Sequence, residues 1–388
     1  MSPVDAATEI RARNAAITAA ITCVAVVGIG LSLTIPLLSI AMARMGASST
    51  LVGVNTAVAG LASILTVPFV PRLAARVGVV RLLLAAIGLG AACLAAFPLL
   101  PSLGAWFVIR FLFSTSLGAL FVLSEYWISE AAPPARRGLV IGIYATVLSV
   151  GLAVGPALLS LLGTEGATPY LAGAGLFLAG MLPLLLARGL SPGIAHDPAL
   201  RLSGYLRLAP TATLAALVYG AVETGGFAIL PLYALRFGHA PETAAGLVSA
   251  LALGNVVFQI PLGWLADRID RRIVLAAASL GGGLLAALIP LAAASAPLLV
   301  ALLFVWGGLV GTLYTVGLAH LGASVSGPAL AGANAAFVML YNVGLMLGPP
   351  VIGGGMDLMP PHGFAVAVAA VVLAYAAGLG AALARRPR

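Results

Sequence analysis

Long apolar segments constrain this sequence more than any other feature. Twelve segments reach the roughly 20 residues that an α-helix needs to cross a bilayer. Charged residues make up only 8% of the chain, so a soluble fold would expose far more apolar surface than water tolerates. The chain is therefore predicted to be an all-α membrane protein with twelve transmembrane helices. We place them at residues 15–43, 50–71, 80–100, 104–130, 138–162, 168–187, 209–235, 242–265, 273–295, 297–321, 329–354 and 363–384.

The distribution of arginines predicts the orientation of these helices. Nearly all of them fall in alternate links between the apolar segments, on the side that also carries both termini. Only Arg44 and Arg236 fall on the other side, and Arg110 falls within a helix. Because cytoplasmic links carry an excess of basic residues, both termini are predicted to be cytoplasmic, in a bacterial inner membrane.

Several other classes of protein are disfavoured. The net charge of +8 comes from arginines that do not cluster with aromatic residues, so nucleic-acid binding is not expected. Cys23 and Cys93 lie in apolar stretches, which argues against a disulfide framework or a zinc site. The run at 15–43 is too long for the apolar region of a cleavable signal peptide. We expect no enzyme activity, no cofactor and no metal site.

The two halves of the sequence resemble each other. At an offset of roughly 192 residues, PLLSIAMARMG (36–46) aligns with AILPLYALRFG (228–238), and the stretch at 70–86 aligns with that at 262–278. Such a repeat predicts two six-helix bundles with the translocation pathway between them. Their predicted bounds are 1–190 and 209–388, joined by a cytoplasmic linker at 191–208.

Glu223 is the deepest acidic residue in the predicted helices. It lies near the middle of the helix at 209–235, where a charge costs on the order of 3 kcal/mol. Burial there favours the neutral form, which suits a group that takes up and releases a proton. Glu223 is therefore the candidate proton-coupling or substrate carboxylate, and a hydrogen-bonded structural acid is the alternative.

Arg110 and Glu125 are the other two ionisable residues that stand out inside the predicted helices. They lie roughly 22 Å apart along the fourth helix at 1.5 Å per residue, so they cannot pair directly. Arg110 could modulate a carboxylate or hold an anionic substrate. Glu125 could share in the proton or substrate chemistry, or pair with Arg136 or Arg137 at the cytoplasmic edge.

The loop at 263–272 reads Gly-Trp-Leu-Ala-Asp-Arg-Ile-Asp-Arg-Arg. It resembles the signature Gly-x-x-x-Asp-Arg-x-Gly-Arg-Arg of the major facilitator superfamily. Its carboxylate can cap a neighbouring helix, and its arginines can pair with acids, so that the cluster holds one conformation and breaks in another. A solvated turn is the alternative. The expected gating residues are Asp267, Arg268, Arg271, Arg272 and, in the first-half copy, Arg76.

Two departures from that signature are visible. Asp270 stands where the family has glycine, so the turn is expected to differ locally. In the first-half copy Ala75 replaces the aspartate, which predicts weaker gating there.

Glycine and proline recur at one spacing in the fifth and eleventh helices. The elements are Gly151-x-x-x-Gly155-Pro156 and Gly344-x-x-x-Gly348-Pro349. Four-residue glycine spacing allows close helix packing, and proline allows a bend. The first element resembles the antiporter signature of drug exporters but lacks the Gly-Gly pair that follows it there, so simple packing is an equal alternative. The expected bend residues are Gly155, Pro156, Gly348 and Pro349.

Aromatic and amide side chains on the later helices are candidates to line the substrate cavity. They are Phe227, Trp306, Tyr314, Tyr341 and Asn342. Stacking of a planar solute would use such residues, although packing and interface belts also explain aromatics.

Nearly the whole chain resembles the major facilitator superfamily. Arg110 resembles the intramembrane arginine in helix four of many proton-coupled members. Segments such as Leu230-Pro231-Leu232-Tyr233 and 259–263 resemble the YcaD-like bacterial subgroup, which is related to riboflavin and copper importers.

The resemblance implies a monomeric secondary transporter that moves a small solute by alternating access, with protons as the expected coupling ion. A planar organic solute such as riboflavin is the leading substrate. Drug or metabolite efflux by proton antiport, import of copper or another metal ion, and a non-transporting membrane sensor are the alternatives.

Overall fold

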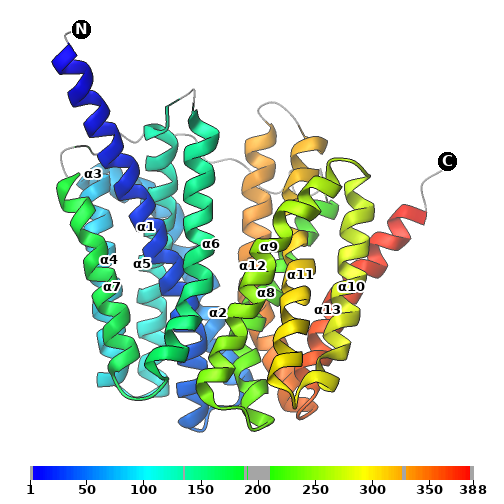
Figure 1. Cartoon of the computed structure of the whole chain (residues 1–388). Helices are drawn as coiled ribbons and strands as arrows, with labels where there is room; N and C mark the ends of the chain where they lie inside the picture. Colours follow the sequence, from blue (N-terminus) through cyan, green and yellow to red (C-terminus); the bar gives the residue numbers. More distant parts are fainter. Residues whose placement is uncertain (1–2, 134–135, 188–189, 191–209, 326–328, 385–388) are drawn as a thin grey trace. The chain divides into compact units, whose positions relative to one another are not determined.

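The structure is a computed structural model that describes the chain except residues 1–2, 134–135, 188–189, 191–209, 326–328 and 385–388 (Figure 1). All regular structure in the described part is helical, because backbone groups in lipid must be hydrogen-bonded within their own segment. The helices are α1 (Pro3–Arg44), α2 (Ser49–Thr66), η1 (Val67–Phe69), α3 (Val70–Val77), α4 (Val79–Leu99), α5 (Leu103–Ala131), α6 (Arg137–Leu162), α7 (Thr168–Leu186), α8 (Pro210–Arg236), α9 (Pro241–Ala266), α10 (Arg271–Ala292), α11 (Ala296–Ser324), α12 (Ala329–Leu358) and α13 (Gly363–Ala384).

The prediction of twelve membrane-spanning helices is confirmed. Within the described residues, 12 helical stretches are long and apolar enough to cross a membrane. One of them, Ser49–Val77, combines α2, η1 and α3. At the other end of the chain, α12 continues to Leu358, past the end predicted at residue 354, and therefore includes Asp357.

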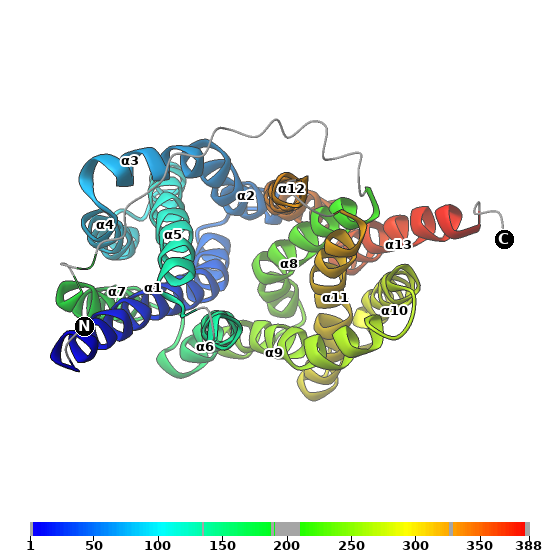
Figure 2. The same cartoon turned by 90° about the horizontal axis from the view of Figure 1, so that it is seen from above.

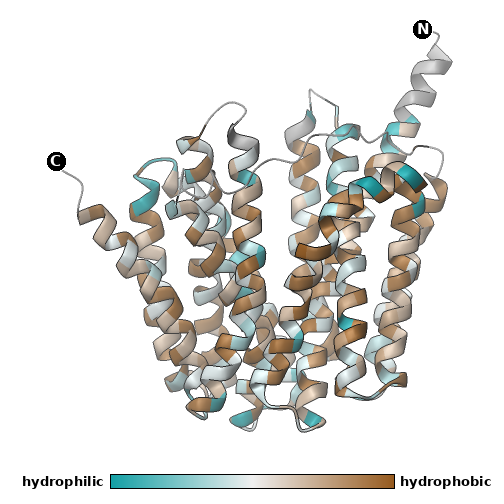
Figure 3. Ribbon diagram, turned by 180° about the vertical axis from the view of Figure 1, so that it is seen from behind, coloured by the Kyte–Doolittle hydropathy of each residue, from teal (hydrophilic) through white to brown (hydrophobic). Residues whose placement is uncertain are grey.

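Large apolar side chains on the helix exteriors identify the lipid-facing surface. Ile260 and Leu291 are 81% and 79% exposed, which a water-soluble protein would not tolerate over many neighbouring positions. Figure 3 shows hydrophobic residues along the lengths of the helices, with hydrophilic residues mainly near their ends. This pattern fits a protein whose solvent is the bilayer.

The chain divides into two compact units. Unit 1 comprises Met1–Thr34 and Leu61–Asp197, and unit 2 comprises Ile35–Gly60 and Pro198–Arg388. The end of α1 and most of α2 thus group with the later helices. The bundles at 1–190 and 209–388 remain a prediction, and the predicted linker at 191–208 lies wholly outside the described residues.

Unit 1 is held together by small residues and by hydrogen bonds between helices. A Cβ atom at Gly28 of α1 would lie 2.7 Å from the carbonyl oxygen of Leu148 in α6. Beside this contact, Ser32 Oγ donates to the carbonyl oxygen of Gly151 at 2.9 Å. Close backbone approach at small residues is how membrane helices associate without a hydrophobic driving force.

Unit 2 is organised around α8. This helix packs against α9, α11, α12 and α13, and Figure 2 shows it from above beside α11 and α12. Within its apolar window 83% of residues are buried, the largest share among the spans in the described chain. Glycines permit the closest contact, because a Cβ at Gly344 of α12 would lie 2.1 Å from the carbonyl oxygen of Leu217. Tyr219 and Thr224, in the middle of α8, are accordingly buried.

Candidate functional site

Glu223 of α8 accepts hydrogen bonds from two tyrosines. Tyr219 lies four residues earlier on the same helix, and its hydroxyl donates to Glu223 Oε1. The second donor is the Tyr341 hydroxyl of α12, 2.8 Å from Oε2. Residues at i and i+4 share one helix face, and the close approach of α8 and α12 brings Tyr341 to that face. Both oxygens of this half-buried carboxylate are thus occupied by phenol donors.

Three tyrosine rings form a cluster around this carboxylate. The ring centroids of Tyr219 and Tyr341 are 5.9 Å apart with an interplanar angle of 23°. Tyr314 of α11 completes the triangle, at 5.4 Å from Tyr219 and 5.5 Å from Tyr341. These distances lie in the range of favourable aromatic pairs. Of the predicted cavity residues, Tyr341 is therefore brought to Glu223, and Tyr314 is brought to the two tyrosines that bind this carboxylate.

Two amides on α9 extend the polar cluster. Asn255 Nδ2 donates to the Tyr219 hydroxyl at 2.8 Å, and Gln259 Nε2 donates to Asn255 Oδ1 at 3.3 Å. The sequence analysis missed Tyr219, Asn255 and Gln259 as site residues. Spacing could have identified them: Tyr219 lies four residues before Glu223, and Asn255 lies four residues before Gln259. Residues at this spacing share one face of a helix, so the polar side chains of each pair are adjacent.

The other predicted cavity residues lie elsewhere in unit 2. Phe227 and Trp306 are buried, at 4% and 0% exposure, and Trp306 Nε1 has no hydrogen-bond partner within the described structure. A Cβ at Gly226 would lie 3.6 Å from the Trp306 ring, so this indole packs against α8. The Asn342 amide donates to the carbonyl oxygen of Val338 on its own helix at 2.9 Å. These three side chains do not contact Glu223 through any hydrogen bond or ring contact that the structure describes.

Arg110 and Glu125 belong to unit 1 and Glu223 to unit 2. The Arg110 side chain is 2% exposed, and its Nε has no partner among the described residues. Glu125 is exposed on α5, next to a buried hydrogen bond of 2.9 Å between the hydroxyls of Ser124 and Tyr144. No ion pair joins Glu125 to Arg136 in the described part, and the Arg137 side chain lies outside it.

The loop between α9 and α10 is organised by short-range contacts. Arg271 Nη2 lies 3.3 Å from Asp267 Oδ1, and the Arg268 guanidinium lies 3.4 Å from the centroid of the Trp264 ring. Arg272 Nε donates to Nε2 of His320 on α11 at 3.4 Å. Together with His320, residues 266–271 line a pocket of about 300 Å³.

The carboxylate that caps α10 is Asp270, not Asp267. Asp270 Oδ1 accepts a hydrogen bond from the backbone N–H of Arg272 at 2.9 Å, in the position of an N-cap residue. Asp267 is instead the C-cap residue of α9, directly after Ala266. The residue that departs from the family signature therefore starts the next helix. In the first-half copy, Arg76 is exposed in the last turn of α3.

The glycine and proline elements lie at close helix contacts. A Cβ at Gly155 would lie 2.1 Å from Ser32 Oγ, and one at Gly348 would lie 2.2 Å from the carbonyl oxygen of Ala221. Both α6 and α12 continue through Pro156 and Pro349 without a break in the helix. These contacts favour the packing interpretation of the elements.

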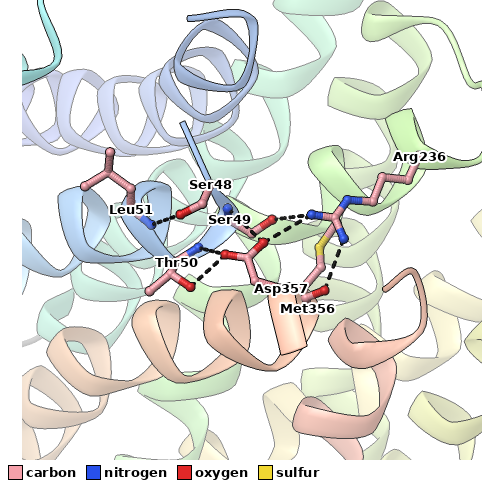
Figure 4. A network of polar contacts seen from close by, with 7 residues as sticks. All are labelled: Ser48, Ser49, Thr50, Leu51, Arg236, Met356 and Asp357. Atoms are coloured by element: carbon pink, nitrogen blue, oxygen red, sulfur yellow. Dashed lines mark hydrogen bonds and ion pairs between the residues drawn. The ribbon is translucent and has the colours of Figure 1, made fainter. Parts of the chain in front are cut away.

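A second polar network in unit 2 joins α2, α8 and α12 (Figure 4). Asp357 accepts hydrogen bonds from the backbone N–H groups of Ser49 and Thr50, at 3.1 and 2.7 Å. Arg236 Nη2 lies 3.2 Å from Asp357 Oδ1 and donates to Ser49 Oγ at 3.0 Å. The sequence analysis missed this network because it ended the two helices just before Arg236 and Asp357.

Comparison with known proteins gives the chain its family. The sequence model of the Major Facilitator Superfamily matches residues 20–251 and 212–388. An uncharacterized MFS-type transporter of Bacillus subtilis, YfkF, is 25% identical over 85% of this chain and 86% of its own length. The uncharacterized MFS-type transporter YcaD of Escherichia coli is 29% identical, and the match spans 63% of each chain.

Solved structures show the same fold. The nucleoside transporter NupG superposes with a TM-score of 0.77 at 15% identity, covering 97% of this chain and all of that one. A bacterial homologue of the human lysosomal transporter Spinster gives a TM-score of 0.71 at 14% identity, covering 96% of each chain. With twelve membrane-spanning helices and the family match over nearly its whole length, this chain belongs to the major facilitator superfamily and is a multi-pass bacterial membrane transporter of the YcaD-like kind.

Proposed function

We propose that this transporter couples the movement of a small planar organic solute to protons, with Glu223 as the group that takes up and releases the proton. The observation that carries the proposal is the Glu223 carboxylate held by the phenols of Tyr219 and Tyr341 in the most buried span. A carboxylate at this depth is costly, and such residues mark ion or substrate pathways in membrane proteins.

The tyrosine cluster supports a planar solute. Tyr219, Tyr314 and Tyr341 bring three aromatic faces together next to a polar group that can orient a ligand. Sites for small molecules typically combine apolar and aromatic walls with a few polar groups. Riboflavin is the first candidate, and nucleosides join it because NupG, with the same fold, is a nucleoside transporter.

The transport cycle proposed is alternating access by a monomer in the bacterial inner membrane, with both termini in the cytoplasm. The loop residues Asp267, Arg268, Arg271 and Arg272 would stabilise one state through the contacts described above. Arg76 would act in the first-half loop. Arg110 and Glu125 are further candidates for the proton or substrate pathway in unit 1.

The test has two steps. First, purified protein is screened by thermal shift against riboflavin, nucleosides, sugars, cationic drugs and copper. Second, a stabilising solute is offered to proteoliposomes with an imposed pH gradient. Glu223→Gln is expected to abolish gradient-driven uptake while solute exchange persists in part, because the amide cannot exchange a proton.

Each alternative predicts a different result. Undiminished gradient-driven uptake by Glu223→Gln vesicles would contradict the coupling role. Stabilisation by copper alone would favour metal import, and export of cationic drugs against a proton gradient would favour efflux. A stabilising ligand that is never transported would favour a sensor.

A further inference from the structure

The hydrogen bonds that link Gln259, Asn255, Tyr219 and Glu223 all point towards Glu223. Gln259 Nε2 donates to Asn255 Oδ1, so the Asn255 amide presents its Nδ2 to the Tyr219 hydroxyl. A phenol has one proton to give and can accept at the same oxygen. Because Tyr219 accepts from Asn255, its own proton is directed to Glu223 Oε1.

The place of Asn255 depends on close packing between α9 and α11. A Cβ at Gly254 would lie 1.8 Å from the carbonyl oxygen of Phe304, so the two backbones are in direct contact. A Cβ at Gly311 of α11 would lie 1.9 Å from Asn255 Oδ1. The observed Asn255 conformation is therefore possible only while residue 311 has no side chain.

An amide in a membrane helix can donate to a carbonyl oxygen of its own helix. Asn342 shows it, since its amide donates to a carbonyl oxygen one turn back on its own helix. Asn255 instead crosses from α9 to a hydroxyl on α8, with its oxygen held by Gln259. Its hydrogen bonds therefore orient the Tyr219 hydroxyl.

We propose that Asn255 is a positioning residue that, seated against Gly311, directs the Tyr219 hydroxyl to Glu223 and so keeps two donors on this carboxylate. The inference rests on the proposed function, in which Glu223 alternates between its charged and neutral forms. Donors aimed at a carboxylate stabilise its charged form, so Asn255 adjusts the proton carrier without touching it.

Infrared difference spectroscopy tests this without knowledge of the solute. The protein is placed in lipid nanodiscs at alkaline pH, and the carboxylate stretching band of Glu223 is isolated as the spectrum of each form minus that of the same form carrying Glu223→Gln. The frequency of this band depends on the number of hydrogen bonds that the carboxylate accepts. Asn255→Leu is expected to move the band towards the position found with Tyr219→Phe, where one donor is missing.

A double variant separates positioning from general disturbance. If Asn255 acts through Tyr219, adding Asn255→Leu to Tyr219→Phe moves the band no further. Gly311→Ala should reproduce the shift of Asn255→Leu with every polar group still present. The matched control is Gly322→Ala on the same helix, where a Cβ would meet nothing within 4 Å and no shift is expected.

The outcomes distinguish the two proposals. An unchanged band in Asn255→Leu, or a shift that persists in the Tyr219→Phe background, overturns the role of Asn255 and leaves the coupling role of Glu223 intact. A carboxylate band that is absent from the wild type at every pH overturns the coupling role, and this inference with it.

Discussion

Asp357 of α12 caps the N-terminus of α2 at Thr50, whose backbone N–H and hydroxyl both donate to Asp357 Oδ2 at 2.7 Å. The two residues lie 307 positions apart in the sequence. A helix N-terminus has unpaired N–H groups and a partial positive charge, and a carboxylate satisfies both. Here the carboxylate comes from another helix, so capping α2 also attaches α2 to α12.

Removing this cap should lower stability. Asp357→Ala leaves two backbone N–H groups without their acceptor and removes the ion pair of Arg236, and we expect a loss of about 1 to 3 kcal/mol. Asp357→Asn should lose less, because asparagine also accepts from helix N–H groups. Thermal unfolding in detergent measures the order, and an Asp357→Ala protein as stable as wild type would contradict it.

The loop carboxylates should differ in their contribution to stability. Asp270→Ala removes the cap of α10 and should cost about 1 kcal/mol. Asp267→Ala should cost less than about 0.5 kcal/mol, because its i, i+4 pair with Arg271 is exposed, with the Asp267 side chain at 72%. Thermal unfolding of the two variants, measured in parallel, checks this order. A larger loss of stability for Asp267→Ala than for Asp270→Ala would contradict it.

Adding one methyl group at the contact between α8 and α12 should lower the stability of the protein. Gly348→Ala places a Cβ 2.2 Å from the carbonyl oxygen of Ala221, which forces the helices apart at a cost of about 1 to 3 kcal/mol. Gly378→Ala on α13 is the control, because nothing lies within 4 Å of its Cβ position. The control should be neutral or slightly stabilising, since alanine favours helix. Equal thermal stability of the two variants would contradict the contact.

Orientation in the membrane is tested by reporter fusions. A reporter that is active only in the cytoplasm should function when fused to the C-terminus and fail when inserted at 237–240, between α8 and α9. The expectation follows from the excess of arginines on the side of the termini. The reverse pattern would invert the membrane orientation without changing the fold.

The number of membrane helices and the position of Glu223 could be predicted from the sequence because both depend on local properties. A run of about 20 apolar residues identifies a membrane-spanning helix, however the neighbouring helices pack against it. A single acid in such a run is equally visible, as is the loop at 263–272. The residue that caps α10 could not be chosen from the sequence, since a choice between Asp267 and Asp270 requires the exact start of the helix.

The partners of these residues were decided only by tertiary structure. Tyr341 reaches Glu223 across 118 positions because glycines let α12 approach α8. Asn255 reaches Tyr219 because Gly311 leaves space for its amide. Hydropathy and motif spacing report on one helix at a time, whereas these hydrogen bonds depend on how two helices are packed and rotated against each other. The sequence by itself therefore determined the twelve spans and the buried acid, and the packing of α8, α9, α11 and α12 decided what surrounds that acid.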